Sequence, residues 1–307
     1  MSDGYLDLNW RFRESWTDMP TGRPVGSTIG SRGGIGEDGR VNTALPDDPA
    51  ALLAALRPHV AHALVTTDFD GTLAPLQVDP EDSRAVPGTI EALTALTRRG
   101  ATVAVVTGRD ARTVVRLGGL DAVPGIVVAG VYGAETWCAG ELLTPDTPAA
   151  VEALRDRLPA TLADVPADPA VWVEDKRLSL VVHARKADDP VAALAAIREP
   201  VTALGEELGF EVHPGSGVLE LRLPGFDKAG AIERLVADRP PSAVLYLGDD
   251  LGDLPAFAEI VRLRERGVPA WSVAVEASAV PEAVAAADVR VPDADAAVAL
   301  LTALAQD

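Results

Sequence analysis

Two aspartates and a glycine directly follow a short apolar run, and this arrangement constrains the fold more than any other feature of the chain. The run Ala63-Leu64-Val65 leads into Asp68-Phe69-Asp70-Gly71-Thr72. Carboxylates one residue apart repel each other and glycine weakens regular structure, so the segment is poor design for stability alone. It is typical of the carboxyl end of a strand in an open parallel α/β sheet, where ligands bind. A solvated turn at Asp70-Gly71 is the alternative interpretation.

The composition favours the same fold class and limits the partners. A chain of 307 residues is long enough for about two domains. It is 48% hydrophobic but only 4% aromatic, so its core would consist mainly of Ala, Val and Leu. That mixture suits buried parallel strands covered by helices. The net charge of −19 argues against nucleic acid or an anionic membrane as a partner.

Cys138 is the only cysteine, which excludes an intramolecular disulfide and fits a reducing compartment. Its neighbour Trp137 favours a buried apolar thiol over a nucleophile. No apolar run is long enough to span a bilayer, and the N-terminus lacks the order of a signal peptide. We therefore expect a cytoplasmic protein, and the sequence is compatible with a monomer.

The chain divides into an extension, a core in two segments and an insertion. Residues 1–45 are glycine-rich with no apolar period, which predicts a poorly ordered extension, and no strand and helix flank these glycines as a phosphate loop requires. Residues 46–145 alternate strands and helices, which predicts a parallel sheet with right-handed crossovers. Residues 146–223 interleave helices with strand-like runs, and the parallel pattern resumes over 224–307. The sequence predicts an α/β fold: a doubly wound, mostly parallel, Rossmann-like core sheet with an inserted α+β cap domain.

The individual elements follow from hydrophobic periodicity. Core strands are predicted at 63–67, 102–106, 126–129, 243–247, 271–275 and 289–291. The first helix is predicted at 49–60, and the cap is predicted to contain helices at 149–158 and 190–208 with strand-like runs at 171–185 and 210–223.

Polar clusters follow three of the predicted core strands. They are Asp68/Asp70/Thr72, Thr107/Gly108/Arg109 and Asp249/Asp250/Asp253. Because parallel strands all end at the same edge of a sheet, the clusters should converge there. Gathered oxygen donors would bind a hard cation such as Mg2+, which offsets the repulsion of the carboxylates and screens an incoming phosphate. A solvated acidic loop is the alternative for the last cluster taken alone.

The motifs resemble those of the haloacid dehalogenase phosphatase superfamily. DFDGT at 68–72, TGR at 107–109, Lys228 and GDDLGD at 248–253 occur in order on the predicted elements. The resemblance implies that Asp68 attacks phosphorus to form an aspartyl-phosphate, and that Asp70 protonates the leaving alcohol and then activates water.

The same resemblance implies roles for the other motif residues. Thr107 holds a phosphoryl oxygen, and Lys228 bridges that oxygen and the nucleophile. Mg2+ is expected on Asp68, the backbone carbonyl of Asp70 and Asp249, with Asp253 assisting from outside the ligand set. Arg109 is expected either to contact substrate or to form a structural ion pair.

Longer segments narrow the resemblance to trehalose-6-phosphate phosphatases. They are DFDGTLAPLQVDPEDSRAVP from Asp68, VEDKRLSLVVHAR from Val173, VLELRLPGFDKAGA from Val218 and GDDLGDLPAF from Gly248. This family implies that Glu174, Lys176, Arg185 and Glu220 bind the sugar hydroxyls through charge-assisted hydrogen bonds. Ordinary cross-strand ion pairs are the alternative for the cap run, and His183 is interpreted as structural.

Three positions depart from the family pattern. Tyr132 stands where members often have histidine, Arg177 where glycine is common, and Ala229 where glycine usually follows the lysine. None is a catalytic group, so they put sugar affinity in doubt more than phosphatase chemistry.

The sequence therefore predicts an Mg2+-dependent phosphatase that hydrolyses trehalose 6-phosphate, the last step of trehalose biosynthesis, with a small sugar phosphate as its partner. One alternative is a related phosphatase acting on sucrose phosphate or mannosyl-phosphoglycerate, which the cap residues disfavour. A phosphomutase on the same core is another. The third is a non-catalytic sensor of the sugar phosphate, which the complete set of Asp68, Asp70, Lys228 and Asp249 disfavours.

Overall fold

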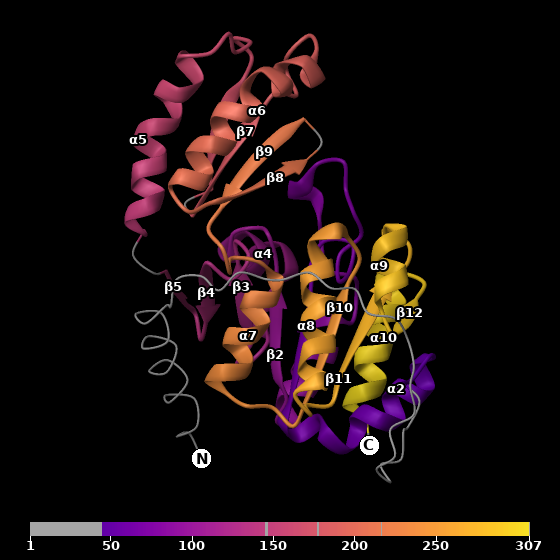
Figure 1. The fold of residues 1–307 in the computed structure, drawn as a ribbon. Helices are drawn as coiled ribbons and strands as arrows, with labels where there is room; N and C mark the ends of the chain where they lie inside the picture. Colours follow the sequence, from indigo (N-terminus) through magenta and orange to yellow (C-terminus); the bar gives the residue numbers. More distant parts are fainter. Residues whose placement is uncertain (1–44, 145–146, 177, 216, 307) are drawn as a thin grey trace, which may run out of the picture.

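The computed structural model of the chain describes residues 45–144, 147–176, 178–215 and 217–306. It contains a large, mostly parallel sheet and a smaller antiparallel sheet that lies above it (Figure 1). The predicted N-terminal extension lies outside the described residues except for Leu45.

The large sheet is built from two separate parts of the chain. Its strands are β1 (Ala63–Thr67), β2 (Thr102–Val106), β3 (Val127–Gly130), β4 (Glu135–Cys138), β5 (Glu141–Leu143), β10 (Ala243–Gly248), β11 (Ala270–Val275) and β12 (Val289–Val291). Their order is β12-β11-β10-β1-β2-β3-β4-β5, and only β4 and β5 run antiparallel to their neighbours. β1 therefore lies at the centre, with Leu64 paired to Val244 on one side and to Thr102 on the other.

Helices cover both faces of this sheet. On one face lie α2 (Pro49–Leu56), α3 (Thr89–Arg98), α4 (Ala111–Gly118) and α10 (Ala294–Ala305), and on the other α7 (Lys228–Asp238), α8 (Leu254–Glu265) and α9 (Pro281–Ala286). Short 3-10 helices are η1 (Arg57–His62), η2 (Pro80–Asp82), η3 (Leu120–Ala122) and η4 (Leu251–Asp253). Successive strand residues point to opposite faces of the sheet, so each face has its own hydrophobic core. Val65 lies in the core under the first group of helices and Leu64 in the core under the second. The predicted doubly wound α/β class is confirmed.

The smaller sheet forms the cap. Its elements are α5 (Ala149–Ala163), β6 (Trp172–Asp175), β7 (Ser179–His183), α6 (Pro190–Glu207), β8 (Glu211–Gly215) and β9 (Val218–Arg222). The strands are antiparallel in the order β6-β7-β9-β8, and both helices pack on the face that carries Leu180 and Leu221. The other face is left for polar side chains. Leu178 and Phe226 pack on Ala134 of the core, where cap and core meet.

Some predicted elements differ from those observed, for local reasons. Each strand-like run of the cap is a hairpin of two strands. The edge hairpin β4–β5 was not predicted. Ala139 and Gly140 form its tight turn, with φ values of 52° and 82°. The sequence pairs that usually indicate such a turn are Asn-Gly and Asp-Gly, and Ala-Gly is not one of them. The first helix stops being α-helical at Leu56 because Pro58 lacks an N–H and disfavours α geometry at the residue before it.

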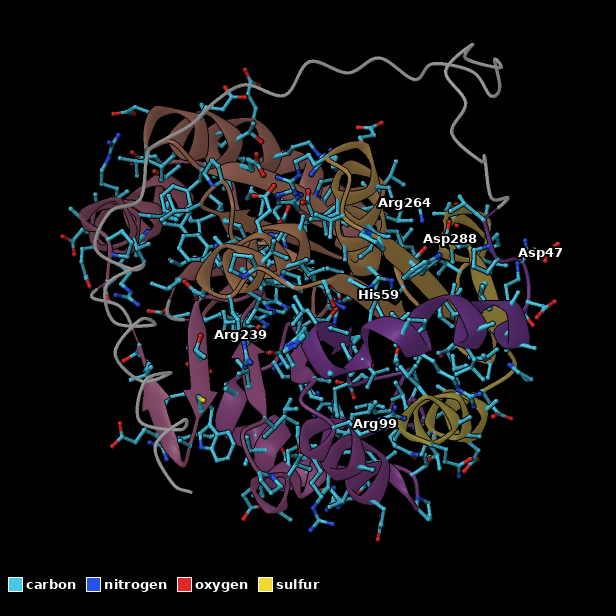
Figure 2. The ribbon with its side chains drawn as sticks, turned by 90° about the horizontal axis from the view of Figure 1, so that it is seen from below. Asp47, His59, Arg99, Arg239, Arg264 and Asp288 are labelled. Atoms are coloured by element: carbon cyan, nitrogen blue, oxygen red, sulfur yellow. The ribbon has the colours of Figure 1, made fainter. Side chains whose placement is uncertain are left out.

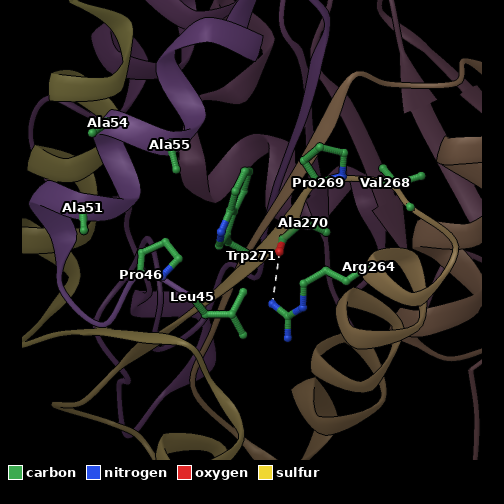
Figure 3. Close-up of a pocket in the computed structure, with 11 residues that line it drawn as sticks. Leu45, Pro46, Ala51, Ala54, Ala55, Arg264, Val268, Pro269, Ala270 and Trp271 are labelled. Carbon is green, nitrogen blue, oxygen red and sulfur yellow. Dashed lines mark hydrogen bonds between the residues drawn. The ribbon is translucent and has the colours of Figure 1, made fainter. Parts of the chain in front are cut away.

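At the end of the sheet opposite the cap, arginines tie neighbouring elements together (Figure 2). Arg264 donates to the Ala270 carbonyl at 3.1 Å and pairs with Asp288 at 2.5 Å, and Arg99 reaches the Gln306 carbonyl at 2.5 Å. Beside Trp271 and α2 lies a mostly apolar groove of about 820 Å3 (Figure 3). None of the helices described is long and apolar enough to cross a membrane.

Candidate active site

The polar clusters that follow β1, β2 and β10 meet in one cleft of about 440 Å3, at the carboxyl ends of these three adjacent strands. The cleft is lined by Asp68, Asp70, Leu76, Thr107, Gly108, Arg109, Tyr132, Lys176, Lys228, Asp249, Asp250, Gly252, Ser278 and Val280. The core residues predicted from the sequence lie together here, apart from Thr72 and Asp253, which support the cleft from behind through Asp249.

A buried ion pair between Asp68 and Lys228 forms the centre of the cleft. The two residues are 5% and 3% exposed, and Lys228 Nζ lies 3.0 Å from Asp68 Oδ2. Lys228 is the first residue of α7, whose start is fixed by Asp227 accepting the Gly230 N–H at 2.7 Å. Burial opposes the charge on Lys228, but the carboxylates of Asp68 and its neighbours outweigh burial and raise the pKa of Lys228. Lys228 is therefore an ammonium at neutral pH.

Burial also acts on Asp68. It raises the pKa of Asp68 above the ordinary carboxyl value, while the Lys228 ammonium opposes that rise. The nucleophile candidate is thus a desolvated carboxyl group whose one strong cationic partner, Lys228, favours the ionised form that attacks an electrophile.

Asp253 anchors this network from below. It is fully buried and accepts from Lys228 Nζ at 2.6 Å, from the backbone N–H groups of Asp249 and Asp250 at 2.8 and 2.9 Å, and from the Tyr246 hydroxyl. Burial opposes ionisation, but the Lys228 ammonium and these hydrogen bonds lower the pKa of Asp253. With its oxygens occupied by donors, Asp253 orients the groups around it.

Asp249 carries a carboxylate oxygen that the described chain leaves unsatisfied. Its Oδ1 accepts from the Thr72 hydroxyl at 3.0 Å, whereas its buried Oδ2 has no hydrogen-bond partner among the residues described. Only glycine fits at Gly71, because a Cβ there would collide with Oδ2. Burial, aided by the charge of Asp253, raises the pKa of Asp249 to about 7. A buried oxygen of this kind is a suitable ligand for a hard cation.

A second group of acidic oxygens in the cleft already has one cationic partner. Oxygens of Asp68, Asp250 and Asp253 lie within 4.8 Å of one another. The Lys228 ammonium, however, lies 3.0, 3.9 and 2.6 Å from them. The single positive charge of Lys228 offsets at most one of these three negative charges, and Asp249 Oδ2 is in addition a buried oxygen without a hydrogen-bond partner among the residues described.

Asp70 is held by Arg109, the residue for which the sequence left two roles open. Arg109 Nε lies 2.5 Å from Asp70 Oδ2, and its Nη2 lies 2.6 Å from Oδ1, so the pair is bidentate. The Ser83 hydroxyl donates to the same Oδ1 at 2.9 Å. Thr107, 2% exposed, accepts the Arg109 backbone N–H through its hydroxyl at 3.1 Å. The structure thus pairs Arg109 with an aspartate of the cleft.

The predicted sugar-binding residues occupy different parts of the cap. Glu174, Val181 and Glu220 are paired across β6, β7 and β9, so their side chains share the face not covered by the helices. Lys176 lines the cleft itself. Arg185 lies two residues beyond the C-terminal end of β7. It is exposed and is not among the cleft-lining residues.

His183, interpreted as structural, contacts one of these residues. Its Nε2 lies 2.8 Å from Glu174 Oε2, and the Trp172 ring stacks on the imidazole with centroids 4.0 Å apart. His183 therefore orients Glu174, one of the residues predicted to bind the sugar.

Sequence reasoning missed a contact between cap and core. The Arg222 guanidinium of β9 lies 4.6 Å from the centroid of the Tyr132 ring, a cation–π distance. Tyr132 and Val131 have φ values of 58° and 48°, a conformation that only a tight turn after β3 maintains. Residues 220 and 222, two apart in a strand, share a face, and that spacing could have indicated Arg222, but nothing in the sequence pointed to Tyr132 as its partner.

The other two departures are less informative. Ala229 is buried inside α7. Arg177 lies outside the described residues.

Comparison with known proteins identifies the family. Residues 66–293 match the family model described as trehalose-phosphatase, which is well over half of the chain. The chain belongs to the trehalose-phosphatase family. The resemblance noted in the sequence is confirmed.

Individual relatives agree. The trehalose-phosphate phosphatase of Mycobacterium marinum is 34% identical over 228 residues, covering 68% of this chain and 55% of the relative. The chain thus spans about half the length of the curated relatives it matches. A solved Aspergillus fumigatus trehalose-6-phosphate phosphatase superposes with a TM-score of 0.66 at 24% identity, covering 85% of this chain and 99% of that one. A haloacid dehalogenase-like hydrolase from Bacteroides thetaiotaomicron superposes with a TM-score of 0.56 at 15% identity, covering 78% and 98%. These members of the superfamily share the capped α/β fold.

Proposed function

We propose that this chain is a phosphoric monoester hydrolase that converts trehalose 6-phosphate to trehalose and inorganic phosphate. The observation that carries the proposal is one cleft in which the buried Asp68–Lys228 pair, Asp70 and the unsatisfied Asp249 come together, in a chain of the trehalose-phosphatase family. We propose further that phosphate passes through a covalent intermediate on Asp68.

In this mechanism the core residues divide the reaction into two steps. Asp68 attacks phosphorus, with Lys228 at 3.0 Å favouring its ionised form. Asp70 gives a proton to the departing sugar oxygen, and later takes one from the water that hydrolyses the aspartyl-phosphate. The Thr107 hydroxyl, at the end of β2, holds a phosphoryl oxygen, and Lys228 stabilises the charge that develops between that oxygen and Asp68.

Mg2+ fits the donors of this cleft. The ion would be held by Asp68, Asp249 and the backbone carbonyl of Asp70. Asp253 orients Asp249 by accepting a hydrogen bond from the Asp249 backbone N–H at 2.8 Å. The support is the buried Asp249 Oδ2, which has no partner in the described part of the chain. When bound, the ion supplies positive charge that offsets the repulsion between carboxylates and phosphate.

The cap residues are proposed to bind the sugar. Lys176 lines the cleft, and Glu174 and Glu220 share the cap face not covered by helices. Acids and cations bind sugar hydroxyls through charge-assisted hydrogen bonds. Arg185 belongs to the same proposal with less support, because it lies outside the cleft lining.

The test is phosphate release from trehalose 6-phosphate with Mg2+ and with EDTA, beside sucrose 6-phosphate and glucose 6-phosphate. We expect release that needs the metal and selects the trehalose ester. Faster release from another ester would retain the phosphatase and overturn its substrate. A shifted phosphate with little free phosphate would indicate a phosphomutase. Tight binding by calorimetry without any release would indicate a sensor.

A further inference from the structure

Ser83 is a buried hydroxyl placed between two charged groups of the cleft. It lies between η2 and α3 and is 1% exposed. Its Oγ donates to Asp70 Oδ1 at 2.9 Å and lies 3.1 Å from Arg109 Nη2, from which it accepts. A buried hydroxyl that is satisfied on both sides has one preferred orientation, and it restricts the orientation of its partners.

Arg109 is equally constrained. Nε and Nη2 bind Asp70, Nη2 also binds Ser83, and Nη1 donates to the Pro80 carbonyl at 2.7 Å. All three guanidinium nitrogens are therefore engaged before any sugar arrives, and the side chain is only 19% exposed. These contacts use four of the five N–H donors, so the geometry suits Arg109 to holding Asp70.

The two oxygens of Asp70 are held differently. Oδ1 accepts from Ser83 and from Arg109 Nη2, whereas Oδ2 accepts only from Arg109 Nε among the described residues. A carboxylate oxygen with one donor keeps capacity for a further hydrogen bond. Asp70 itself lines the cleft and is 23% exposed. Oδ2 is thus the oxygen available to a substrate.

We propose that Ser83 and Arg109 are positioning residues that fix the Asp70 carboxyl so that Oδ2 carries the transferred proton, an inference that rests on the proposed phosphatase chemistry. As the bond from phosphorus to the leaving oxygen breaks and the bond from Asp68 to phosphorus forms, the Oδ2–H bond breaks and its proton goes to the leaving oxygen. Asp70 is left as the carboxylate that the Arg109 fork holds. In the second step, the oxygen of a water molecule forms a bond to phosphorus as the bond from Asp68 to phosphorus breaks, one proton of that water goes to Oδ2, and inorganic phosphate leaves.

The test compares two aryl esters in Ser83→Ala. Phenolate leaves well only if it is protonated, whereas 2,4-dinitrophenolate leaves without a proton, so only phenyl phosphate needs a well-positioned acid. We expect kcat on phenyl phosphate to fall about 10- to 100-fold, the effect of one lost hydrogen bond to a charged group, with KM unchanged. The pre-steady-state burst of dinitrophenolate should keep the wild-type rate within about twofold, because that step needs no acid. Ser83→Thr should restore the rate on phenyl phosphate.

Two further variants separate positioning from loop stability. Arg116→Gln breaks the exposed Arg116–Glu81 pair of 2.7 Å, which ties the same segment to α4 without touching Asp70, and should change neither ester. Arg109→Lys keeps the charge but loses the two parallel hydrogen bonds to Asp70. Its kcat on phenyl phosphate should fall further than that of Ser83→Ala.

Equal loss on both esters, or no loss in Ser83→Ala, would overturn the inference. The proposed function is checked separately, by wild-type release of phosphate from trehalose 6-phosphate. Wild-type turnover of the aryl esters without turnover of that sugar ester would overturn the proposed substrate and leave the ester comparison intact.

Discussion

The floor of the cleft and the cap face above it hold their polar groups in different ways. In the floor, Lys228 is 3% exposed and Asp253 is fully buried with its oxygens occupied by donors. On the cap face, the Glu174 side chain is 39% exposed, and among the described residues it pairs with His183. The core therefore fixes its charges before substrate binds, while the Glu174 carboxylate on the cap stays partly hydrated.

This contrast fits a division of labour. Fixed dipoles and charges in a dry site stabilise a transition state without reorganising, although burying them costs stability. In the proposed function, partly exposed groups on the cap exchange water for sugar hydroxyls when the substrate binds. We accordingly expect core substitutions to lower kcat strongly and cap substitutions mainly to raise KM.

The largest effect is expected for Asp68→Asn, which removes the nucleophile and keeps the side-chain shape. Turnover of trehalose 6-phosphate should fall by about 10^4-fold or more, while Lys228 keeps Asp253 as a partner at 2.6 Å and the fold persists. Phosphate release and circular dichroism melting measure the two properties. Asp82→Asn, an exposed aspartate of η2, is the control and should turn over normally. Turnover retained in the Asp68 variant would contradict covalent catalysis.

Asp249→Asn tests the metal ligands and a dependence on pH. Burial raises the pKa of Asp249 to about 7, so the metal-free folded state binds more protons than the unfolded state between about pH 4 and pH 7. Stability of the metal-free protein should therefore fall as the pH rises through that window, and Mg2+ should raise the melting temperature more at pH 8 than at pH 5.5.

In Asp249→Asn most of that Mg2+-dependent shift should be lost, and turnover should fall by at least about 100-fold, because substituting even an outer partner of a metal costs 10- to 100-fold. Thermal shift at both pH values measures the first effect. An undiminished Mg2+ shift in the variant would place the ion elsewhere.

The same contrast explains what the sequence could predict. The core residues follow the ends of β1, β2 and β10, so parallel pairing alone was enough to bring Asp68, Thr107 and Asp249 to one edge. The cap has weaker local rules: each of its strand-like runs contains a turn, and which face meets the core depends on docking. The cap residues named from the sequence came from the family resemblance and not from the pattern of the strands.

Contacts between residues distant in the sequence could not be predicted, for a physical reason. Ser83 and Asp70 meet because the chain between them folds back onto the cleft, and neither residue type signals that path. The Tyr132–Arg222 contact needs a left-handed turn at Val131 and Tyr132, where β-branched and aromatic residues rarely indicate one. In both cases the tertiary fold determines the local conformation.

An intermediate effect is expected where cap meets core. Tyr132→Leu removes the ring over which the Arg222 guanidinium lies at 4.6 Å. A cation–π contact contributes about 0.5–2 kcal/mol, so KM for trehalose 6-phosphate should rise about 2- to 30-fold with kcat nearly unchanged. Steady-state kinetics measure the split. Tyr132→Phe keeps the ring and serves as the matched control. An equal rise in KM with phenylalanine would assign the effect to the hydroxyl.

The smallest effect is expected on the cap face, at His183→Gln. His183 Nε2 lies 2.8 Å from Glu174 Oε2, and Trp172 stacks on the imidazole, so the ring limits the positions open to this partly exposed carboxylate. Glutamine retains a donor but not the stack, and looser orientation of one charged hydrogen-bond partner should raise KM about 2- to 5-fold. His213→Gln changes an exposed histidine of the same sheet, 3.3 Å from Glu211, and should leave KM unchanged. A fall in kcat with an unchanged KM for His183→Gln would mean that the cap takes part in the chemical step, and the division between floor and cap would then be wrong.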